Sequence, residues 1–384
     1  MQTTWPVGLL FSQSGVTGYL ETTQLQGALL AIEEINAAGG ISGRPLQPVI
    51  HDPASEPEGY SRYARDLLAE DGVRAIVGCC TSHCRKAVLP IIERRNGLLF
   101  YPTIYEGFEY SPNVVYGGPS PSQGSVQLAR YLTETYGSRF VFVGSDYVYP
   151  RECNRVMREL VEDRGGRVLD EIYLDLHADR DSFGSVVRRM SELRPDVIFS
   201  TVVGMSTIYL YEACEGMLGG AGVPIASLTT TEAEIALMRP GAALGAITAA
   251  PYFHTLGTPA NRRFVGRYQA RFGQAALANM SAEAAYVQTH LLGRALAQTG
   301  SMEPDDLIEA LAGLPFDAPQ GEIVVDPDNN HTYLWPRIGR VGASGLFEVV
   351  EEAAAPVKPD PYLVNYGASR AWPNEAKSRA EAKP

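Results

Sequence analysis

The stretch RAIVGCCTSHCRKAVLPIIERRNGLLFYPT, residues 74–103, contains one complete strand–helix–strand unit. Largely aliphatic runs at residues 74–77 and 97–100 have the length of buried strands, and a helical pattern begins between them near Thr81. Units of this kind pair their strands in parallel, so the carboxyl ends of the strands meet at one edge of the sheet. The stretch therefore predicts an α/β fold in which polar residues that follow the strands gather at that edge.

The same alternation of strands and helices continues on both sides of this unit. Upstream, apolar residues recur on one face of a helix that Gly39 and Gly40 end, and a strand follows at residues 46–51. A second series begins after the Gly-Gly-Pro break at residues 117–119, which predicts a second sheet. Its strands are expected at residues 140–144, 167–173, 197–200 and 225–228.

Beyond a strand-like run at residues 246–250, helical patterns near residues 259–272 and 281–299 have no new parallel strands beside them. We therefore expect these helices to return to the first lobe, so that the chain crosses between two lobes more than once. Further β-rich pieces follow near residues 321–325 and 332–341.

Length and charge set the broad class of protein. A chain of 384 residues with 45% hydrophobic content exceeds the usual size of a single core, which favours two domains. The 32 basic and 44 acidic residues give a net charge of −12, which would repel a phosphate backbone, so direct binding of nucleic acid is not expected. No run approaches the ~20 apolar residues that span a bilayer, so membrane insertion is not expected either.

The N-terminus and the cysteines bear on the compartment. No basic start, long apolar region or cleavage site precedes the apolar segment at residues 7–11, which predicts a cytoplasmic protein. A periplasmic protein from which an export signal had been removed would begin in the same way. Five cysteines, with Cys79, Cys80 and Cys84 crowded together, make a poor disulfide framework and favour a reducing compartment.

Residues 78–86, GCCTSHCRK, are the densest cluster of reactive side chains. Four nominal zinc ligands within six positions cannot readily surround one tetrahedral ion, and no distant His announces a triad for Cys80 or Cys84. The favoured interpretation uses the exposed N–H groups of the first helical turn, with the hydroxyls of Thr81 and Ser82, to hold a carbonyl oxygen or an anion. Simple helix capping by either hydroxyl is the alternative.

Uncharged hydroxyls follow strands of both lobes. Tyr101, Thr103 and Tyr105 come directly after the strand at residues 97–100, and Tyr147 and Tyr149 follow a strand of the second series. Such hydroxyls donate and accept hydrogen bonds without bringing charge, which suits a polar but neutral ligand, although half-buried packing would explain single tyrosines as well. Thr229 follows another strand of the second series. Since phosphate-binding, nucleophile-elbow and zinc-helix motifs are lacking, we expect no catalytic residue, metal or cofactor.

Five segments, in order and with matching spacing, carry a family resemblance. They are residues 78–88, 101–112, 144–152, 227–234 and 318–321. From Val7 to about Asn365 the chain resembles the aliphatic amide sensors that regulate amidase expression, with the urea-binding transport proteins as further relatives. The resemblance implies a type I periplasmic-binding-protein fold, with two Rossmann-like lobes, three crossovers and a ligand cleft between them.

The implied N-terminal lobe comprises residues 1–120 and 250–328, and the implied C-terminal lobe residues 121–249 and 329–374. A disordered tail is expected at residues 375–384. Hinge closure of the two lobes would report occupancy of the cleft.

The resemblance also implies roles for single residues. Ser82 and Thr103 would bind the amide, Tyr101 and Tyr147 would line the pocket, and Tyr149 and Thr229 would close it from the second lobe. Cys80 stands where the family has a tyrosine, which removes a phenol from the pocket wall and leaves the choice between amides and urea open.

Three functions remain distinct at this stage. The resemblance implies non-catalytic sensing that controls an RNA-binding antitermination regulator protein. The alternative is a solute-binding receptor that delivers urea or short-chain amides to an ABC transporter. A third is an amide hydrolase that uses Cys80 or Cys84, and a homo-oligomer is compatible with any of them.

Overall fold

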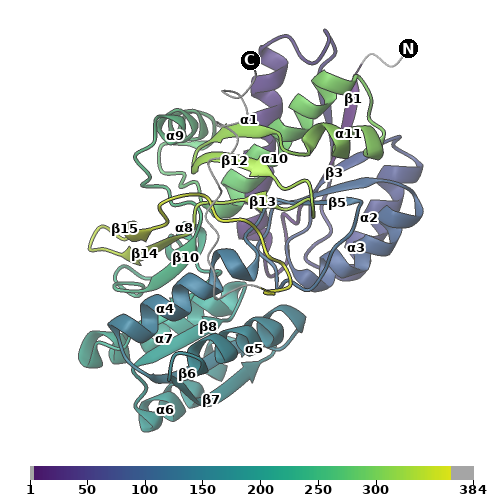
Figure 1. Ribbon diagram of the computed structural model, residues 1–384. Coiled ribbons are helices and arrows are strands. Elements are labelled where there is room, and N and C mark those ends of the chain that lie inside the picture. Colours follow the sequence, from purple (N-terminus) through teal and green to yellow (C-terminus); the bar gives the residue numbers. More distant parts are fainter. Residues whose placement is uncertain (1–3, 365–384) are drawn as a thin grey trace.

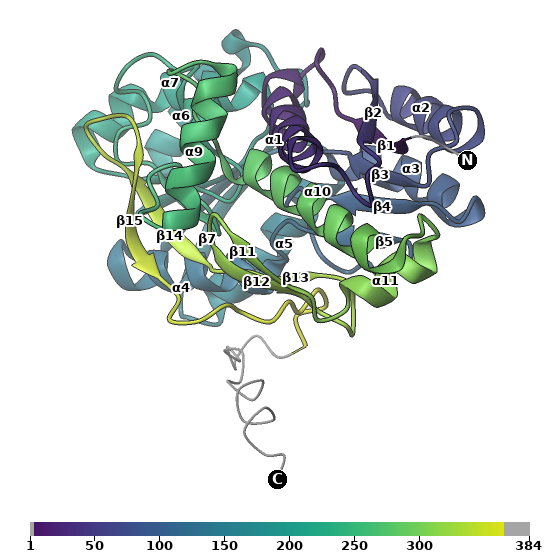
Figure 2. The same ribbon diagram turned by 90° about the horizontal axis from the view of Figure 1, so that it is seen from above.

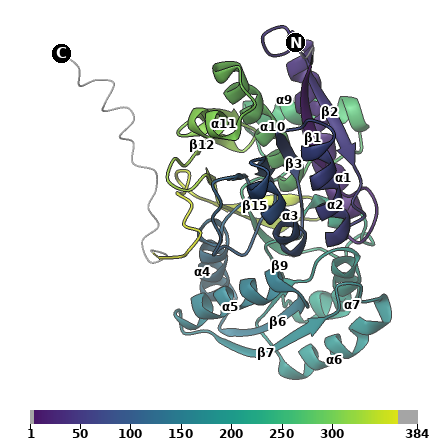
Figure 3. The ribbon, with the colours of Figure 1, turned by 90° about the vertical axis from the view of Figure 1, so that its right-hand side faces the viewer.

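The structure, a computed structural model, describes residues 4–364, apart from the side chains of residues 216–221. The tail expected from residue 375 onward lies outside the described residues. Two lobes lie one above the other (Figure 1, Figure 3), each built around a sheet of its own.

The first lobe contains a five-stranded sheet in the order β2-β1-β3-β4-β5, in which every neighbouring pair is parallel. Each strand begins and ends within one or two residues of a predicted strand where the sequence indicated one. The strands are β1 (Trp5–Leu10), β2 (Leu46–His51), β3 (Ala75–Gly78), β4 (Leu98–Tyr101) and β5 (Val114–Tyr116).

Helices cover both faces of this sheet. Leu25, Ala28 and Ile32 of α1 pack with apolar side chains of α10 and α11 in one core cluster, and α2 and α3 contribute to a second cluster on the opposite face. Figure 2 shows α1 and α10 side by side, so the return to the first lobe that was expected for the helix at residues 281–299 is observed. These helices are α1 (Gly18–Ala37), α2 (Pro57–Ala69), α3 (Ser82–Arg94), α10 (Met280–Thr299) and α11 (Pro304–Leu311). A further helix, α9 (Pro259–Phe272), contacts α1, but its buried aromatic side chains belong to a core cluster of the second lobe.

The second lobe contains a seven-stranded sheet in the order β15-β14-β10-β9-β8-β6-β7. Strands β6 to β10 are parallel, and the last two strands of the chain join the edge in antiparallel orientation. Its members are β6 (Arg139–Ser145), β7 (Arg167–Leu174), β8 (Val197–Thr201), β9 (Ile225–Ser227), β10 (Ile247–Ala250), β14 (Arg337–Val341) and β15 (Phe347–Glu352).

Helices pack on both faces of the second sheet as well. α4 and α5 share one apolar cluster, while α6 and α7 contribute to another, to which Phe264 and Tyr268 of α9 also belong. The helices are α4 (Ser125–Thr135), α5 (Val148–Glu162), α6 (Phe183–Leu193), α7 (Met205–Ala221) and the short α8 (Glu232–Ile235), with 3-10 turns at Pro121–Gln123 and Arg180–Ser182.

The chain passes between the lobes after β5, after β10 and between β13 and β14. A small sheet of β11 (Pro315–Ala318), β12 (Gly321–Val325) and β13 (Thr332–Tyr333) packs on the first-lobe core before the third passage. At the first passage, a Cβ on Gly118 would lie 2.1 Å from the carbonyl oxygen of Thr103, so only glycine fits there. The residue-level bounds of the lobes stay a prediction.

Candidate ligand-binding site between the lobes

A cavity of about 40 Å³ lies between the two lobes. One water needs about 10–15 Å³ of such space, so the cavity has room for only a few heavy atoms. Six of the eight residues expected to bind the ligand line it, namely Cys80, Ser82, Thr103, Tyr147, Tyr149 and Thr229.

The turn from β3 to α3 brings the first of these residues to the cavity. Cys79 has a left-handed backbone with φ of 67°, an unusual conformation for a residue with a side chain, and Gly78 leaves room for the carbonyl of Leu10. After this turn α3 begins with Thr81 as its N-cap, but the Thr81 side chain makes no capping hydrogen bond. Helix capping by its hydroxyl is therefore not observed, and the first turn of α3 opens toward the cavity.

Thr103 presents only a lone pair to the cavity. Its hydroxyl donates to the carbonyl oxygen of Cys79 at 3.1 Å and accepts a hydrogen bond from Nε2 of Gln24 at 2.8 Å. A hydroxyl has one proton and two lone pairs, so one lone pair is left for a ligand. Thr103 can therefore accept a hydrogen bond from a ligand but cannot donate one.

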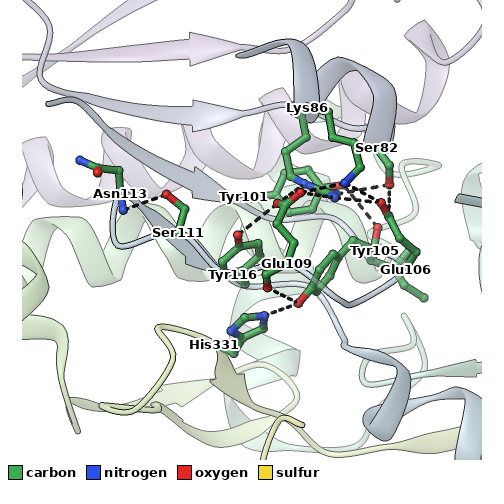
Figure 4. A network of polar contacts seen from close by, with 12 residues as sticks. Ser82, Lys86, Tyr101, Tyr105, Glu106, Glu109, Ser111, Asn113, Tyr116 and His331 are labelled. Atoms are coloured by element: carbon green, nitrogen blue, oxygen red, sulfur yellow. Dashed lines mark hydrogen bonds and ion pairs between the residues drawn. The ribbon is translucent and has the colours of Figure 1, made fainter. Parts of the chain in front are cut away.

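Ser82 belongs to a buried network of charged and polar side chains behind the cavity (Figure 4). Its hydroxyl donates to Oε2 of Glu106 and accepts from Nη1 of Arg85 at 3.3 Å. Arg85 is fully buried and pairs with both Glu106, at 3.2 Å, and Glu109, at 2.8 Å. Lys86 completes a group of two cations and two carboxylates, and Arg85 and Lys86 hold the pKa of Glu109 below its ordinary value against the opposing effect of its burial.

Tyr101 and Tyr105 lie outside the lining of this cavity, in contrast to the other six expected residues. Tyr101 donates its hydroxyl to the carbonyl oxygen of Cys80 at 2.6 Å and so supports the cavity wall from behind. Tyr105 is bonded to Nε2 of His331 at 2.5 Å, and Figure 4 shows both within the network. Burial lowers the pKa of His331 to about 4, so its imidazole is neutral at pH 7.

Three of the expected hydroxyl side chains line the cavity from the second lobe, where Thr207 of α7 lines it as well. Tyr147 is the N-cap of α5, and its ring meets His83 of the first lobe edge-on, with ring centroids 5.0 Å apart. The Tyr149 hydroxyl has no hydrogen-bond partner among the described residues, although Cys153 lies beside it and the side chain is only 3% exposed. Thr229 shares a hydrogen bond of 3.2 Å with Ser227. The Tyr149 proton is thus not held by an oxygen or nitrogen acceptor among the described residues, and only the weakly accepting thiol of Cys153 lies beside it.

Glu234 is the only ionisable carboxylic acid that lines the cavity, and the sequence analysis did not single it out. It accepts hydrogen bonds from the Thr231 hydroxyl at 2.6 Å and, across the cleft, from the Tyr19 hydroxyl at 2.9 Å. Burial raises its pKa, and these hydrogen bonds oppose the rise. The TTTEAE motif marks the segment, but only the fold brings it to Tyr19, which is 215 positions away.

Among residues 4–364, no Lys, Arg or His side chain lines the cavity. Of the cysteine cluster, Cys80 faces the cavity, whereas Cys79 and Cys84 are packed in the first-lobe core. Burial raises the pKa of Cys84 to about 12 and that of Cys80 well above its ordinary value, which disfavours the reactive thiolate. No group of three or more potential metal ligands occurs within residues 4–364.

A family model described as a periplasmic binding protein domain matches residues 5–367. The chain belongs to this family. Among similar proteins, the Leu/Ile/Val-binding protein homolog 6 of Brucella suis is 23% identical over 290 residues, 73% of each chain. The leucine-, isoleucine-, valine-, threonine- and alanine-binding protein of Pseudomonas aeruginosa is 23% identical over 316 residues, 79% of this chain and 80% of that protein.

Solved periplasmic binding proteins share the architecture. A solute-binding protein of an ABC transporter from Rhodopseudomonas palustris, in complex with p-hydroxybenzoic acid, has a TM-score of 0.84 and 21% identity, and the match covers 94% of this chain and 99% of that one. A branched-chain amino acid transporter substrate-binding protein from Streptococcus pneumoniae, in complex with isoleucine, has a TM-score of 0.79 and 21% identity, with 91% and 98% coverage. The expected type I fold with two Rossmann-like lobes is confirmed.

The family supports a small-ligand receptor, and the narrower identification as an amide sensor stays a prediction. None of the helices in the described part of the chain has both the length and the apolar character needed to cross a membrane.

Proposed function

We propose that this periplasmic binding protein holds a small neutral amide or urea-like molecule between its lobes and does so without catalysis. The observation that carries the proposal is the direction of the hydrogen bonds that the Ser82 and Thr103 hydroxyls make within the first lobe. The Ser82 hydroxyl donates its proton to Glu106, and the Thr103 hydroxyl donates its proton to the carbonyl of Cys79. Both hydroxyls therefore offer only lone pairs to the cavity. An amide NH₂ group supplies the two matching donors.

Donors for the other end of an amide are available from both lobes, from Tyr149 in the second lobe and from the first turn of α3 in the first. Tyr149 has a free hydroxyl, and the first turn of α3 has unpaired N–H groups, either of which can donate to a carbonyl oxygen. A buried donor without a partner costs free energy, which a ligand carbonyl would recover. The lone pairs of Ser82 and Thr103 and the donor of Tyr149 on the opposite wall support an amide orientation with its nitrogen toward Ser82 and Thr103.

Charge and size argue against the ligands of the compared structures. Isoleucine and p-hydroxybenzoic acid both carry a carboxylate, and no cationic side chain lines this cavity to compensate one. A cavity of about 40 Å³ also favours molecules as small as acetamide, propionamide or urea. Cys80, at the position of a family tyrosine, sets which of these fits best.

The test is a calorimetric and thermal-shift panel of acetamide, propionamide, butyramide, urea, formamide, leucine and acetate. A bound ligand should stabilise the closed protein by about RT ln(1 + [L]/Kd). Stabilisation by an amide or urea supports the proposal, and stabilisation by leucine alone would reject it in favour of an amino-acid receptor.

For the biological role, the relatives favour a receptor that delivers its ligand to an ABC transporter, with the periplasm as its place of work. The second candidate is a cytoplasmic sensor that holds an antitermination regulator until the amide binds, and its support is the five matching sequence segments. Co-purification with membrane-embedded permease subunits would favour transport. Co-purification with an RNA-binding protein that acetamide releases would favour the sensor.

A further inference from the structure

We infer that Glu106 is a positioning residue that makes the site select an amide over a carboxylate of the same shape, by fixing the direction of the Ser82 hydroxyl. This inference rests on the proposed amide-binding function. Glu106 itself lies behind the cavity wall and is not among the residues that line the cavity.

The two oxygens of Glu106 have different partners. Oε1 faces two cations, with Nη2 of Arg85 at 3.2 Å and Nζ of Lys86 at 3.4 Å. Oε2 faces only the Ser82 hydroxyl within the hydrogen bonds described. A carboxylate flanked by two cations can only accept, so the Ser82 proton must point away from the cavity and toward Glu106.

With its proton donated to Glu106, Ser82 Oγ has two lone pairs that can accept hydrogen bonds. One lone pair accepts the hydrogen bond from Nη1 of Arg85 at 3.3 Å. The other lone pair is left for the cavity, which Ser82 lines. A ligand N–H satisfies this lone pair, whereas a carboxylate oxygen would meet it with another lone pair and bring an uncompensated charge.

Glu106→Gln should reverse the direction of this hydrogen bond. The carboxamide oxygen of the new side chain would take the position of Oε1 between Arg85 and Lys86, because both cations need an acceptor there. Its NH₂ group would then lie beside Ser82 and donate to Oγ. The Ser82 proton would be free to turn into the cavity, where it favours an acceptor such as a carboxylate oxygen.

The experiment compares acetamide with acetate by calorimetry at neutral pH, in the wild-type protein, in three single variants and in one double variant. In Glu106→Gln we expect the affinity for acetamide to fall by about tenfold or more. The ratio of the affinity for acetamide to the affinity for acetate should fall by at least tenfold. Glu109→Gln is the matched control, since Glu109 carries the same charge and also binds Arg85, at 2.8 Å, but makes no hydrogen bond to Ser82. Its ratio should stay within about twofold of wild type.

Ser82→Ala keeps the inference testable if Glu106→Gln does not fold. Loss of the serine lone pair should weaken acetamide and relieve the repulsion of acetate, so the ratio should fall there too. In the double variant Glu106→Gln/Ser82→Ala, the glutamine should change the ratio no further, because its effect passes through Ser82.

The outcomes separate this inference from the proposed function. Suppose that the wild-type protein binds an amide. The role of Glu106 alone would be overturned if Glu106→Gln left the ratio of acetamide to acetate affinity unchanged, or if Glu109→Gln lowered this ratio equally. Absence of any amide or urea binding by the wild-type protein would overturn both.

Discussion

Among single residues, Tyr149 has the simplest test because its hydroxyl is buried and unpaired within the described structure. In Tyr149→Phe the ring stays and only the donor to the ligand carbonyl is lost. We expect acetamide to bind about tenfold more weakly, or about 1–1.5 kcal/mol, with the stability of the ligand-free protein unchanged or slightly raised. Calorimetry and thermal unfolding measure the two effects.

Tyr131→Phe on α4 provides the control, since this tyrosine packs against the second-lobe core away from the cavity. Its amide affinity should equal that of wild type. Equal affinities for all three proteins would mean that the carbonyl oxygen is held elsewhere, for instance by the N–H groups of α3.

The burial of Cys80 leads to a second prediction for a single residue, which concerns how fast its thiol is alkylated. Burial raises the pKa of its thiol, so little thiolate is present near pH 8, and the side chain is only 5% exposed at the cavity wall. We expect an alkylating reagent to modify Cys80 slowly, faster as the pH rises, and several-fold more slowly still when acetamide holds the cleft closed. Mass spectrometry of the peptide follows the rate, and Cys80→Ser identifies the signal. Rapid labelling that acetamide leaves unaffected would contradict a closed cavity at this residue.

The cavity-lining residues that directly follow strands could be predicted from the sequence. Residues whose contacts are remote in the chain could not. Ser82, Thr103, Tyr147, Tyr149 and Thr229 were predictable because strand ends mark the cleft edge of such sheets. Tyr101 ends β4 and Tyr105 lies in the loop that follows, but both side chains lie behind the cavity, and residue spacing alone does not show to which side a side chain at a strand end points.

At the scale of elements, the short helix α8 carries an unusual pair of buried carboxyl groups, Glu232 and Glu234. Burial raises the pKa of Glu232 to about 8, and its side chain accepts a hydrogen bond from the backbone N–H of His254 at 2.8 Å. The folded protein therefore keeps the proton to about pH 8, whereas the unfolded chain loses it near pH 4.5. The stability that this group contributes is fully present below pH 4.5 and is lost as the pH rises toward 8.

Glu232→Gln stays neutral at every pH and keeps the acceptor for His254. We expect the variant to lose less stability than wild type between pH 5 and pH 8, by on the order of 3 kcal/mol, measured by urea unfolding at several pH values. A residual decline should remain, because burial also raises the pKa of Glu21 and Glu283 to about 7. Glu134→Gln, at an exposed position of α4, should leave the wild-type profile intact. A Glu232→Gln profile parallel to wild type would contradict a buried, protonated Glu232.

The elements themselves were largely predictable from sequence. The bounds of β2 and β12 agree with the predicted ranges, and most of the other predicted strands differ at their ends by one or two residues. The β-rich piece predicted at residues 332–341 is instead divided into β13 and β14, which belong to different sheets. The antiparallel addition of β14 and β15 to the second sheet was not predicted, because antiparallel pairing at an edge depends on the third passage between lobes and leaves no local signal. The network around Arg85 was likewise hidden, since charge spacing within residues 85–109 does not reveal which charges are buried.

For the whole molecule, two side-chain contacts that cross the cleft bear on the closure of the lobes. The Tyr19 hydroxyl on α1 donates to Glu234 on α8 at 2.9 Å, and His83 meets Tyr147 edge-on at 5.0 Å. Both contacts join one lobe to the other and can exist only when the lobes are closed. The apparent affinity of a ligand falls with the fraction of closed, binding-competent protein, so each contact contributes to affinity without touching the ligand.

Tyr19→Phe should therefore shift the ligand-free protein toward an open form and weaken acetamide binding by about three- to tenfold, as expected for one lost hydrogen bond. Small-angle scattering should give a larger radius of gyration than wild type without ligand and the same radius at saturating acetamide, because the ligand still drives closure. Tyr63→Phe, which alters a tyrosine stacked on His51 in the first lobe, should change neither quantity. Unchanged scattering together with unchanged affinity in Tyr19→Phe would mean that the Tyr19–Glu234 bond forms only as a consequence of closure and contributes nothing to its free energy.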